Sequence, residues 1–361
     1  MIIYRRFSFY LLFIALSLVL GACSSASTIA SSWPGLAVNG NVAYLAYHTQ
    51  VYAINASTGV QLWNYPTEPD NRIHFYADPV LSPDGQLLVG GYHHILYSLN
   101  PQNGQLNWQF QQAKNRYVGS PLATEKGIYA PNADKNLYAL DLKGNLLWTF
   151  TTKGEIWGRP IASANGDIIF LPSLDHTVYA IDAENGKARW STGDLGGAVI
   201  GTPALGEDGT LYLGTLGSEV LALDSTDGTI HWRASTEGWV WCGIALAEDR
   251  LFFGDLNGNL YALQPSNGSQ LWQIKPDQLD GPIVATPLIS GDMLYVATES
   301  GTLYAINREG SIQWSQIIGG KLYTTPAIAE DTLLVSPMNS EEYLVALSMD
   351  GVRKWSFSLK K

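Results

Sequence analysis

The chain has 361 residues, of which 46% are hydrophobic and 15% charged, a balance that supplies a folded core and excludes disorder for most of the length. Its net charge of −11 at pH 7 and the lack of a basic run predict no nucleic-acid partner, because phosphate binding needs clustered Lys and Arg. The two cysteines, Cys23 and Cys242, are too few for a disulfide framework or a cysteine-rich zinc site.

The first residues predict a cleaved leader. Two arginines precede an apolar run at 7–20, which is shorter than the ~20 residues that a membrane-spanning helix needs. The run ends in Leu-Gly-Ala-Cys, which resembles the lipobox of bacterial lipoproteins. That resemblance implies a signal peptide over 1–22, lipidation of Cys23, and a flexible Ser-rich tether over 23–33. An ordinary secretory leader with an incidental cysteine is the alternative.

A lipobox also implies a compartment. Lipid chains on the new N-terminus would hold the protein on a bacterial membrane, outside the cytoplasm. Two locations stay open: the periplasmic side of an outer membrane, or the outer leaflet of the cytoplasmic membrane.

Beyond the tether, one motif recurs eight times. Each copy contains a strand-like segment with a Tyr-Ala-hydrophobic core or a close variant, then a Gly, and four residues after that Gly a Trp. The eight tryptophans, spaced 40 to 45 residues apart, are Trp63, Trp108, Trp148, Trp190, Trp232, Trp272, Trp314 and Trp355. Repeats of this length are typical of propellers and solenoids.

Each repeat is interpreted as four short strands. In the repeat that ends at Trp272 we expect them at 240–246, 251–254, 260–263 and 270–274. The motif Gly permits a tight turn with positive φ, and the Trp provides an apolar plate between sheets. The predicted fold is therefore all-β: one eight-bladed β-propeller of four-stranded antiparallel blades over 34–361, present as a monomeric ring. Closure by a strand from 25–33 and simple packing of the first blade on the eighth both remain open.

The motif Tyr-Ala-hydrophobic-Asp/Asn followed by Gly-x-x-x-Trp resembles the tryptophan-docking motif of the PQQ-repeat (quinoprotein-like) propeller family. Together with the lipobox it is similar to the BamB family of outer-membrane assembly lipoproteins. The resemblance implies a non-catalytic, membrane-tethered scaffold that binds protein partners and assists envelope protein assembly. The motif specifies the fold more strongly than the function, because many activities share this scaffold.

The antiparallel order of the strands locates a candidate binding face. Because consecutive strands run in opposite directions, the connections between blades lie on the same face as the turns between second and third strands. These inter-blade connections include the longest loops. Short acidic turns occupy the opposite face. Just after the long loops, near the predicted mouth of the central channel, stand the residues of a possible ligand or partner funnel: Tyr76, Asp78, Trp157, Arg159, Trp241 and Tyr323. Packing of the aromatic side chains between blades is the alternative.

Other candidate chemistry is sparse. His48, His74, His93 and His94 share the loop face and are weak metal candidates, but no fixed ligand spacing appears, so we expect solvated loop histidines and no metal. Cys242 sits at a small-residue position of an inner strand and is expected to be buried and unreactive.

Two further functions are weighed against the scaffold. One is a PQQ-dependent dehydrogenase with PQQ and calcium in the funnel. The larger quinoprotein alcohol dehydrogenases use a vicinal Cys pair and a Glu/Asn/Asp calcium set, which this chain does not match, so we predict no enzyme and no cofactor. The other is recognition of a glycan or small ligand on the aromatic rim of the funnel.

Overall fold

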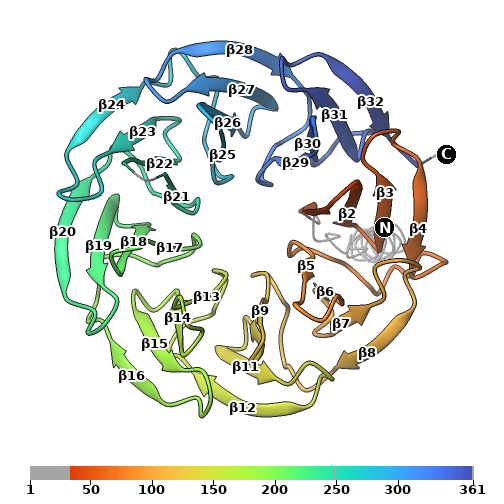
Figure 1. Cartoon of the computed structure of the whole chain (residues 1–361), viewed down its shortest axis with the longest axis horizontal. Helices are drawn as coiled ribbons and strands as arrows, with labels where there is room; N and C mark the ends of the chain where they lie inside the picture. The colour runs from red at the N-terminus through yellow and green to blue at the C-terminus, as the bar shows by residue number, and fades with distance from the viewer. Residues whose placement is uncertain (1–32, 248, 360–361) are drawn as a thin grey trace, which may run out of the picture. The chain divides into compact units, whose positions relative to one another are not determined.

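The computed structural model describes residues 33–247 and 249–359. The expected leader, the lipidation site Cys23 and the tether up to residue 32 lie outside these residues. The described residues form eight separate four-stranded antiparallel sheets and no helix, so none of their elements is a helix that could cross a membrane. The sheets are arranged radially around one axis (Figure 1), which confirms the predicted eight-bladed β-propeller.

The blades follow the chain, each running from its innermost to its outermost strand. Blades 1 to 4 are β1 (Gly35–Asn39), β2 (Val42–Tyr47), β3 (Gln50–Asn55) and β4 (Gln61–Tyr65); β5 (Val80–Leu81), β6 (Leu87–Gly90), β7 (Leu96–Leu99) and β8 (Leu106–Phe110); β9 (Leu122–Thr124), β10 (Gly127–Pro131), β11 (Asn136–Leu140) and β12 (Leu146–Thr151); β13 (Ile161–Ala162), β14 (Ile168–Pro172), β15 (Val178–Asp182) and β16 (Ala188–Ser191). Blades 5 to 8 are β17 (Ala204–Leu205), β18 (Thr210–Thr215), β19 (Glu219–Asp224) and β20 (Ile230–Ser235); β21 (Ala245–Leu246), β22 (Leu251–Gly254), β23 (Leu260–Leu263) and β24 (Gln270–Ile274); β25 (Leu288–Ser290), β26 (Met293–Ala297), β27 (Thr302–Asn307) and β28 (Ile312–Ile317); β29 (Ala327–Ala329), β30 (Thr332–Val335), β31 (Leu344–Ser348) and β32 (Arg353–Phe357).

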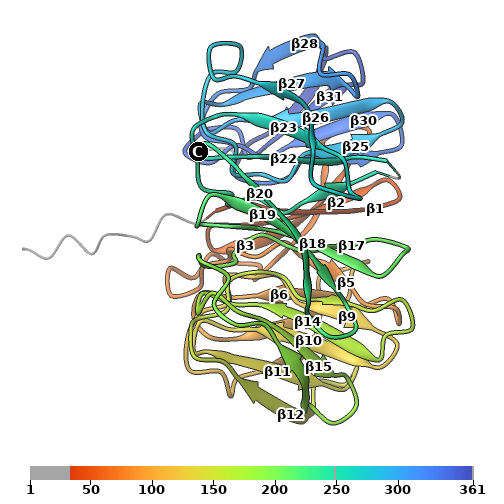
Figure 2. The same cartoon turned by 90° about the vertical axis from the view of Figure 1, so that its left-hand side faces the viewer.

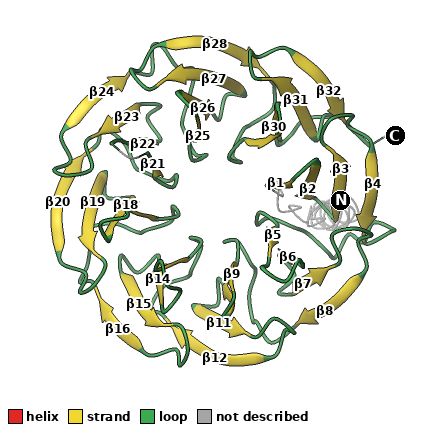
Figure 3. Ribbon diagram, viewed as in Figure 1, coloured by secondary structure: helices red, strands yellow, loops and turns green. Residues whose placement is uncertain are grey.

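Buried apolar side chains fill the spaces between neighbouring blades. The second and third strands of each blade are almost fully buried, as their Leu-, Val- and Tyr-rich sequences predict, whereas the fourth strands alternate exposed and half-buried residues. Figure 2 shows the ring from the side, and Figure 3 distinguishes the strands from the loops in the face-on view. The core is thus a set of radial seams around an open centre.

The repeated tryptophans hold adjacent blades together. In each case the indole N–H donates a hydrogen bond to a carbonyl of the next blade, as from Trp63 to the Pro101 oxygen at 2.9 Å. The indole also lies on the motif Gly of that blade: a Cβ added at Gly104 would stand 2.5 Å from the Trp63 ring. Gly104 has φ +71° as well. The motif Gly is therefore required twice, by the turn and by the docked indole.

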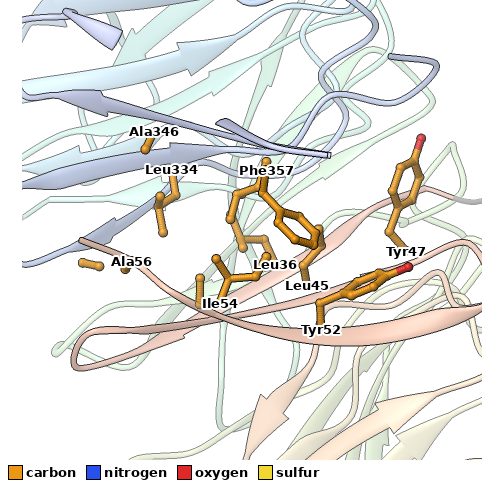
Figure 4. Close-up of a cluster of buried hydrophobic side chains, with 12 residues drawn as sticks. Leu36, Leu45, Tyr47, Tyr52, Ile54, Ala56, Leu334, Ala346 and Phe357 are labelled. Carbon is orange, nitrogen blue, oxygen red and sulfur yellow. The ribbon is translucent and has the colours of Figure 1, made fainter. Parts of the chain in front are cut away.

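Among the described residues, the ring closes by packing of blade 1 on blade 8. Every blade, the first and eighth included, is built from four consecutive strands. Trp355 of the last blade donates to the Ala56 oxygen of the first at 3.1 Å. Figure 4 shows Leu36 and Ile54 of blade 1 beside Leu334 and Phe357 of blade 8, in one buried cluster. The first and eighth blades therefore pack on each other as one of the two predicted closures requires, whereas the other, a strand from 25–33, falls almost entirely outside the described residues.

One predicted strand is too long. The innermost strand of blade 6 was expected over 240–246, but β21 contains only Ala245–Leu246. The preceding residues run along the channel and bond to neighbouring blades instead. Val240 N donates to the Thr215 oxygen at 3.1 Å, and Gly243 N donates to Thr286 Oγ1 at 2.9 Å. The backbone at the channel is satisfied across blades, which a strand pattern does not reveal.

Candidate functional site

A cavity of about 180 Å³ lies where the innermost strands begin, at the mouth of the central channel. All eight blades contribute to its lining. The six side chains proposed from the sequence all line it: Tyr76, Asp78, Trp157, Arg159, Trp241 and Tyr323. The structure therefore brings the residues that were selected from the sequence together in one place.

Local sequence explains why these side chains converge. Tyr76 and Asp78 stand two residues apart, as do Trp157 and Arg159, so the members of each pair lie on the same side of the backbone and line the channel. The residue between them is small because the next blade passes close by. A Cβ at Gly119 would lie 2.5 Å from the Trp157 oxygen, and a Cβ at Gly158 would lie 2.7 Å from the Ile200 oxygen. Small residues at this position let the mouth segments pack side by side around the channel.

Trp33 is the residue of this site that the sequence analysis missed. The tether was expected to extend to residue 33, but the Trp33 ring belongs to the mouth of the ring and lines the cavity. Its ring centroid lies 5.1 Å from that of Tyr323, 6.2 Å from that of Trp241 and 6.3 Å from that of Tyr76. Trp33 lies outside the repeats, so no periodic signal marked it; a lone Trp-Pro pair after a Ser-rich run was the available hint.

The segment that carries Trp33 is fitted to its neighbours. The Pro34 carbonyl accepts a hydrogen bond from the Thr324 hydroxyl of blade 8. Leu36 N donates to Asp78 Oδ1 of blade 2 at 3.0 Å. Gly35 lies so close to the Ala77 carbonyl that no larger residue fits without a shift. Contacts on both sides therefore hold the backbone beneath Trp33.

A second layer supports the aromatic wall on one side. Tyr76 stacks on Tyr92 with ring centroids 4.5 Å apart and an interplanar angle of 25°. Arg116 lies over the Tyr92 ring at 4.9 Å, donates to its hydroxyl at 2.5 Å, and lies 5.9 Å from the Trp157 ring. These residues come from a turn and an inter-blade loop whose conformations the sequence did not predict. They restrict how Tyr76 and Trp157 can move.

Polar partners fix two other rings. The Trp157 indole N–H donates to Glu155 at 2.7 Å, and the Tyr323 hydroxyl donates to Glu299 at 2.8 Å. Lys321 binds the same Glu299 carboxylate at 2.5 Å, and this contact holds the pKa of Glu299 below its usual range. The polar ends of both aromatic side chains are occupied, which leaves ring surface as their contribution to the cavity.

Two charged side chains, Asp78 and Arg159, are among the described residues of the lining. Burial raises the pKa of Asp78, against the opposing effects of the Leu36 N–H and of Arg159. Burial lowers the pKa of Arg159, and Asp78 opposes that shift. The Arg159 side chain is exposed to the solvent of the channel that it lines. No ion pair within 4 Å joins the two in the described structure.

The four histidines do not form a metal centre in the part of the chain that the structure describes, where no group of three or more potential ligands could hold an ion. His93 Nε2 pairs with the Tyr97 hydroxyl at 2.6 Å, and burial is the main cause that lowers the pKa of His93 to about 4. His48 has its pKa lowered by burial too, with a further contribution from His74. The prediction of solvated histidines is therefore wrong for His48 and His93, which pack in their turns against Tyr47 and Tyr97.

Cys242 lies in the cavity wall with 2% of its surface exposed. Its thiol exchanges weak hydrogen bonds with the backbone of Gly254 in the same blade, at 3.3 and 3.4 Å. Burial raises the pKa of Cys242 to about 12, so the thiolate is not formed at neutral pH. The residue has the surroundings of the buried, unreactive thiol that the sequence predicts.

Eight radial sheets joined by indoles docked on a Gly turn define a PQQ-repeat, quinoprotein-like β-propeller. A family profile described as outer membrane protein assembly factor BamB matches residues 22–155, 133–276 and 257–361. The chain belongs to this family.

Individual relatives agree with that assignment. The outer membrane protein assembly factor BamB of Moranella endobia (strain PCIT) is 26% identical over 304 residues, which cover 79% of this chain and 75% of that protein. The crystal structure of BamB from Moraxella catarrhalis has a TM-score of 0.71 at 17% identity and covers 86% of this chain and 92% of that one. At this identity the structural likeness establishes the fold.

The same repeats occur in proteins of other kinds. The serine/threonine-protein kinase AfsK of Streptomyces coelicolor is 39% identical over 176 residues, which are 48% of this chain but 20% of the kinase. A likeness confined to a fifth of that protein carries nothing about phosphoryl transfer.

Proposed function

We propose that this protein is a non-catalytic binding protein of the cell envelope that assists the assembly of outer-membrane proteins. The observation that carries the proposal is the match of the BamB family profile along almost the whole chain. The relative from Moranella endobia, named an assembly factor, supports it over three quarters of its own length.

The anchoring part of the proposal rests on the first residues. A leader over 1–22 and a lipidated Cys23 would hold a monomeric ring on the periplasmic side of the outer membrane. The wild-type protein is expected in the membrane fraction, labelled by a fatty-acid analogue. Cys23→Ser should lose the label and leave the membrane fraction. A variant that stays on the membrane would contradict lipid anchoring.

The loop face of the ring is the proposed site for protein partners. Its inter-blade loops are tied to the adjacent turns by backbone hydrogen bonds, as between Tyr92 N and the His74 oxygen at 2.7 Å or between Leu256 N and the Trp239 oxygen at 2.9 Å. The face is therefore a preformed surface. Trp239 stands on it with 55% of its surface exposed, a large aromatic anchor of the kind found at the centres of interfaces.

Photocrosslinking in cells tests this assignment of faces. A photoreactive residue at 239 should give adducts with envelope proteins. The same residue at exposed Glu207, in a short acidic turn of the opposite face, is the matched control and should give few. Equal adduct patterns from both positions, or adducts from 207 alone, would overturn the loop-face assignment without affecting the family assignment.

The lining of the channel does not suit the enzymatic alternative. A calcium-bound PQQ site needs several carboxylate or amide ligands, whereas the described lining contains one carboxylate, Asp78, which already accepts the Leu36 N–H. Cys242, the thiol of the described chain, has no cysteine partner. We therefore propose no catalytic role. Addition of PQQ and calcium is expected to produce no dye-linked alcohol oxidation, and measurable turnover would reverse this conclusion.

A further inference from the structure

One arginine of the channel mouth differs from all the others in the described structure. Seven of the eight described arginines donate hydrogen bonds to other groups of the chain: Arg72, Arg116, Arg189, Arg233, Arg250, Arg308 and Arg353. Arg159 donates none and has no ion pair among the described residues. Its guanidinium, with five N–H donors in a planar fork, lines the cavity without a protein acceptor.

The nearby carboxylate does not fill this role. Asp78 is held by the Leu36 N–H on the blade 1 side of the channel, and it lies too far from Arg159 for an ion pair. The Arg159 side chain is exposed to the solvent of the channel, and its N–H donors have no hydrogen-bond acceptor among the described residues. An incoming carboxylate could replace the water on this guanidinium with two parallel charge-assisted hydrogen bonds. The charge of the site thus favours an anion over a cation.

The rest of the wall favours an aromatic group. Trp33, Tyr76, Trp241 and Tyr323 lie within one cluster of ring contacts, and Trp157 lies 6.4 Å from Trp241. Aromatic rings attract one another in tilted and offset arrangements of this kind. The cavity of about 180 Å³ is slightly larger than the ~150 Å³ apolar cavity that admits benzene in another protein. It has room for one six-membered ring and a small acidic group.

We propose that the channel mouth binds a carboxylate carried close to an aromatic ring, with Arg159 holding the carboxylate and the aromatic wall, Trp33 included, holding the ring. Two sources share this chemistry: a free aromatic acid, and a polypeptide whose last residue is aromatic. The inference stands apart from the proposed assembly function, because it depends only on the lining of the channel.

Calorimetric titration of the purified protein with phenylacetate and with phenylacetamide tests the site, since the two probes differ in charge and hardly in shape. The acid is expected to bind at least tenfold more tightly than the amide, as one charge-assisted contact predicts. Arg159→Gln should remove this difference while the thermal unfolding curve stays unchanged. Arg189→Gln, on the outer strand β16 and paired with Asp182, is the matched control and should keep it. Trp241→Ala should weaken both probes.

A second pair of probes distinguishes the sources. If the site accepts the end of a chain, N-acetyl-Gly-Phe with a free carboxylate should bind as tightly as phenylacetate, and its carboxamide should not. If phenylacetate alone binds, the site takes a free acid. Either result supports the carboxylate site. Failure of both acids to bind, equal affinity for acid and amide, or unchanged preference in Arg159→Gln would overturn it.

Discussion

His93 should make the folded protein sensitive to mild acid. It lies in the turn between β6 and β7, where its Nε2 meets the Tyr97 hydroxyl and its ring meets Phe75 edge-on at 6.1 Å. Burial lowers the pKa of His93 to about 4, and His74 and His94 act in the same direction, whereas the His74 backbone and Asp70 oppose them. The imidazole is therefore neutral in the folded protein at neutral pH.

The sign and size of the effect follow from proton linkage. An unfolded histidine has a pKa near 6.5, so between pH 6.5 and 4 the unfolded chain binds more protons at this site than the folded chain. The favourable contribution is complete above about pH 6.5 and is lost as the pH falls toward 4. A shift of 6.5 − 4, about 2.5 units, corresponds to about 3 kcal/mol in full and to about 2.5 kcal/mol at pH 4.5.

Urea unfolding at pH 7 and at pH 4.5 measures this contribution. His93→Gln keeps a side chain that hydrogen-bonds but does not titrate, so its free energy of unfolding should fall by about 2.5 kcal/mol less than that of the wild type over this range. His231→Gln, on the outer strand β20, is the control and should follow the wild type. Equal losses for wild type and His93→Gln would refute the reasoning, because all other titrating groups are common to both proteins.

Three more outcomes are expected from the architecture. Gly104→Ala should destabilise the ring by about 2 kcal/mol more than Gly40→Ala in urea unfolding, because both positions have positive φ but only the first would collide with an indole. Trp355→Ala should cost about 3 kcal/mol by removing a docked indole at the closing seam, and a smaller loss in Trp355→Phe would show that ring volume carries part of it. Cys242 should resist a thiol reagent at pH 8 until urea unfolds the protein; rapid labelling of the native state would contradict its burial.

The fold could be predicted because its determinants repeat. A Gly four residues before each Trp has the same two causes in every blade, a turn and a docked indole, so eight copies reinforce one interpretation. The strand ends near the channel were less predictable. Residues such as Val240 and Gly243 obtain their hydrogen bonds from other blades, and a pattern within one segment cannot report on that.

The candidate site was predicted in part for the same reason. Tyr76 and Trp157 occupy equivalent places in the repeat, and so do Asp78 and Arg159, so their position in the repeat was enough to predict that they lie at the channel mouth. Trp33 has no equivalent in the repeats, and Arg116 comes from an inter-blade loop and lies over Tyr92, which stacks on Tyr76. Contacts made once, between segments far apart in the sequence, leave no period to read.

The packing of blade 1 on blade 8 has a consequence for chain connectivity. The indole of Trp355 meets blade 1 through the same kind of contact that joins every other pair of blades, so the seam where the described ends meet is geometrically one junction among eight. A circular permutant opened between β16 and β17, with the old ends linked, would retain every docked indole. The architecture is in this respect modular, because the contacts between blades do not depend on which blade comes first in the chain.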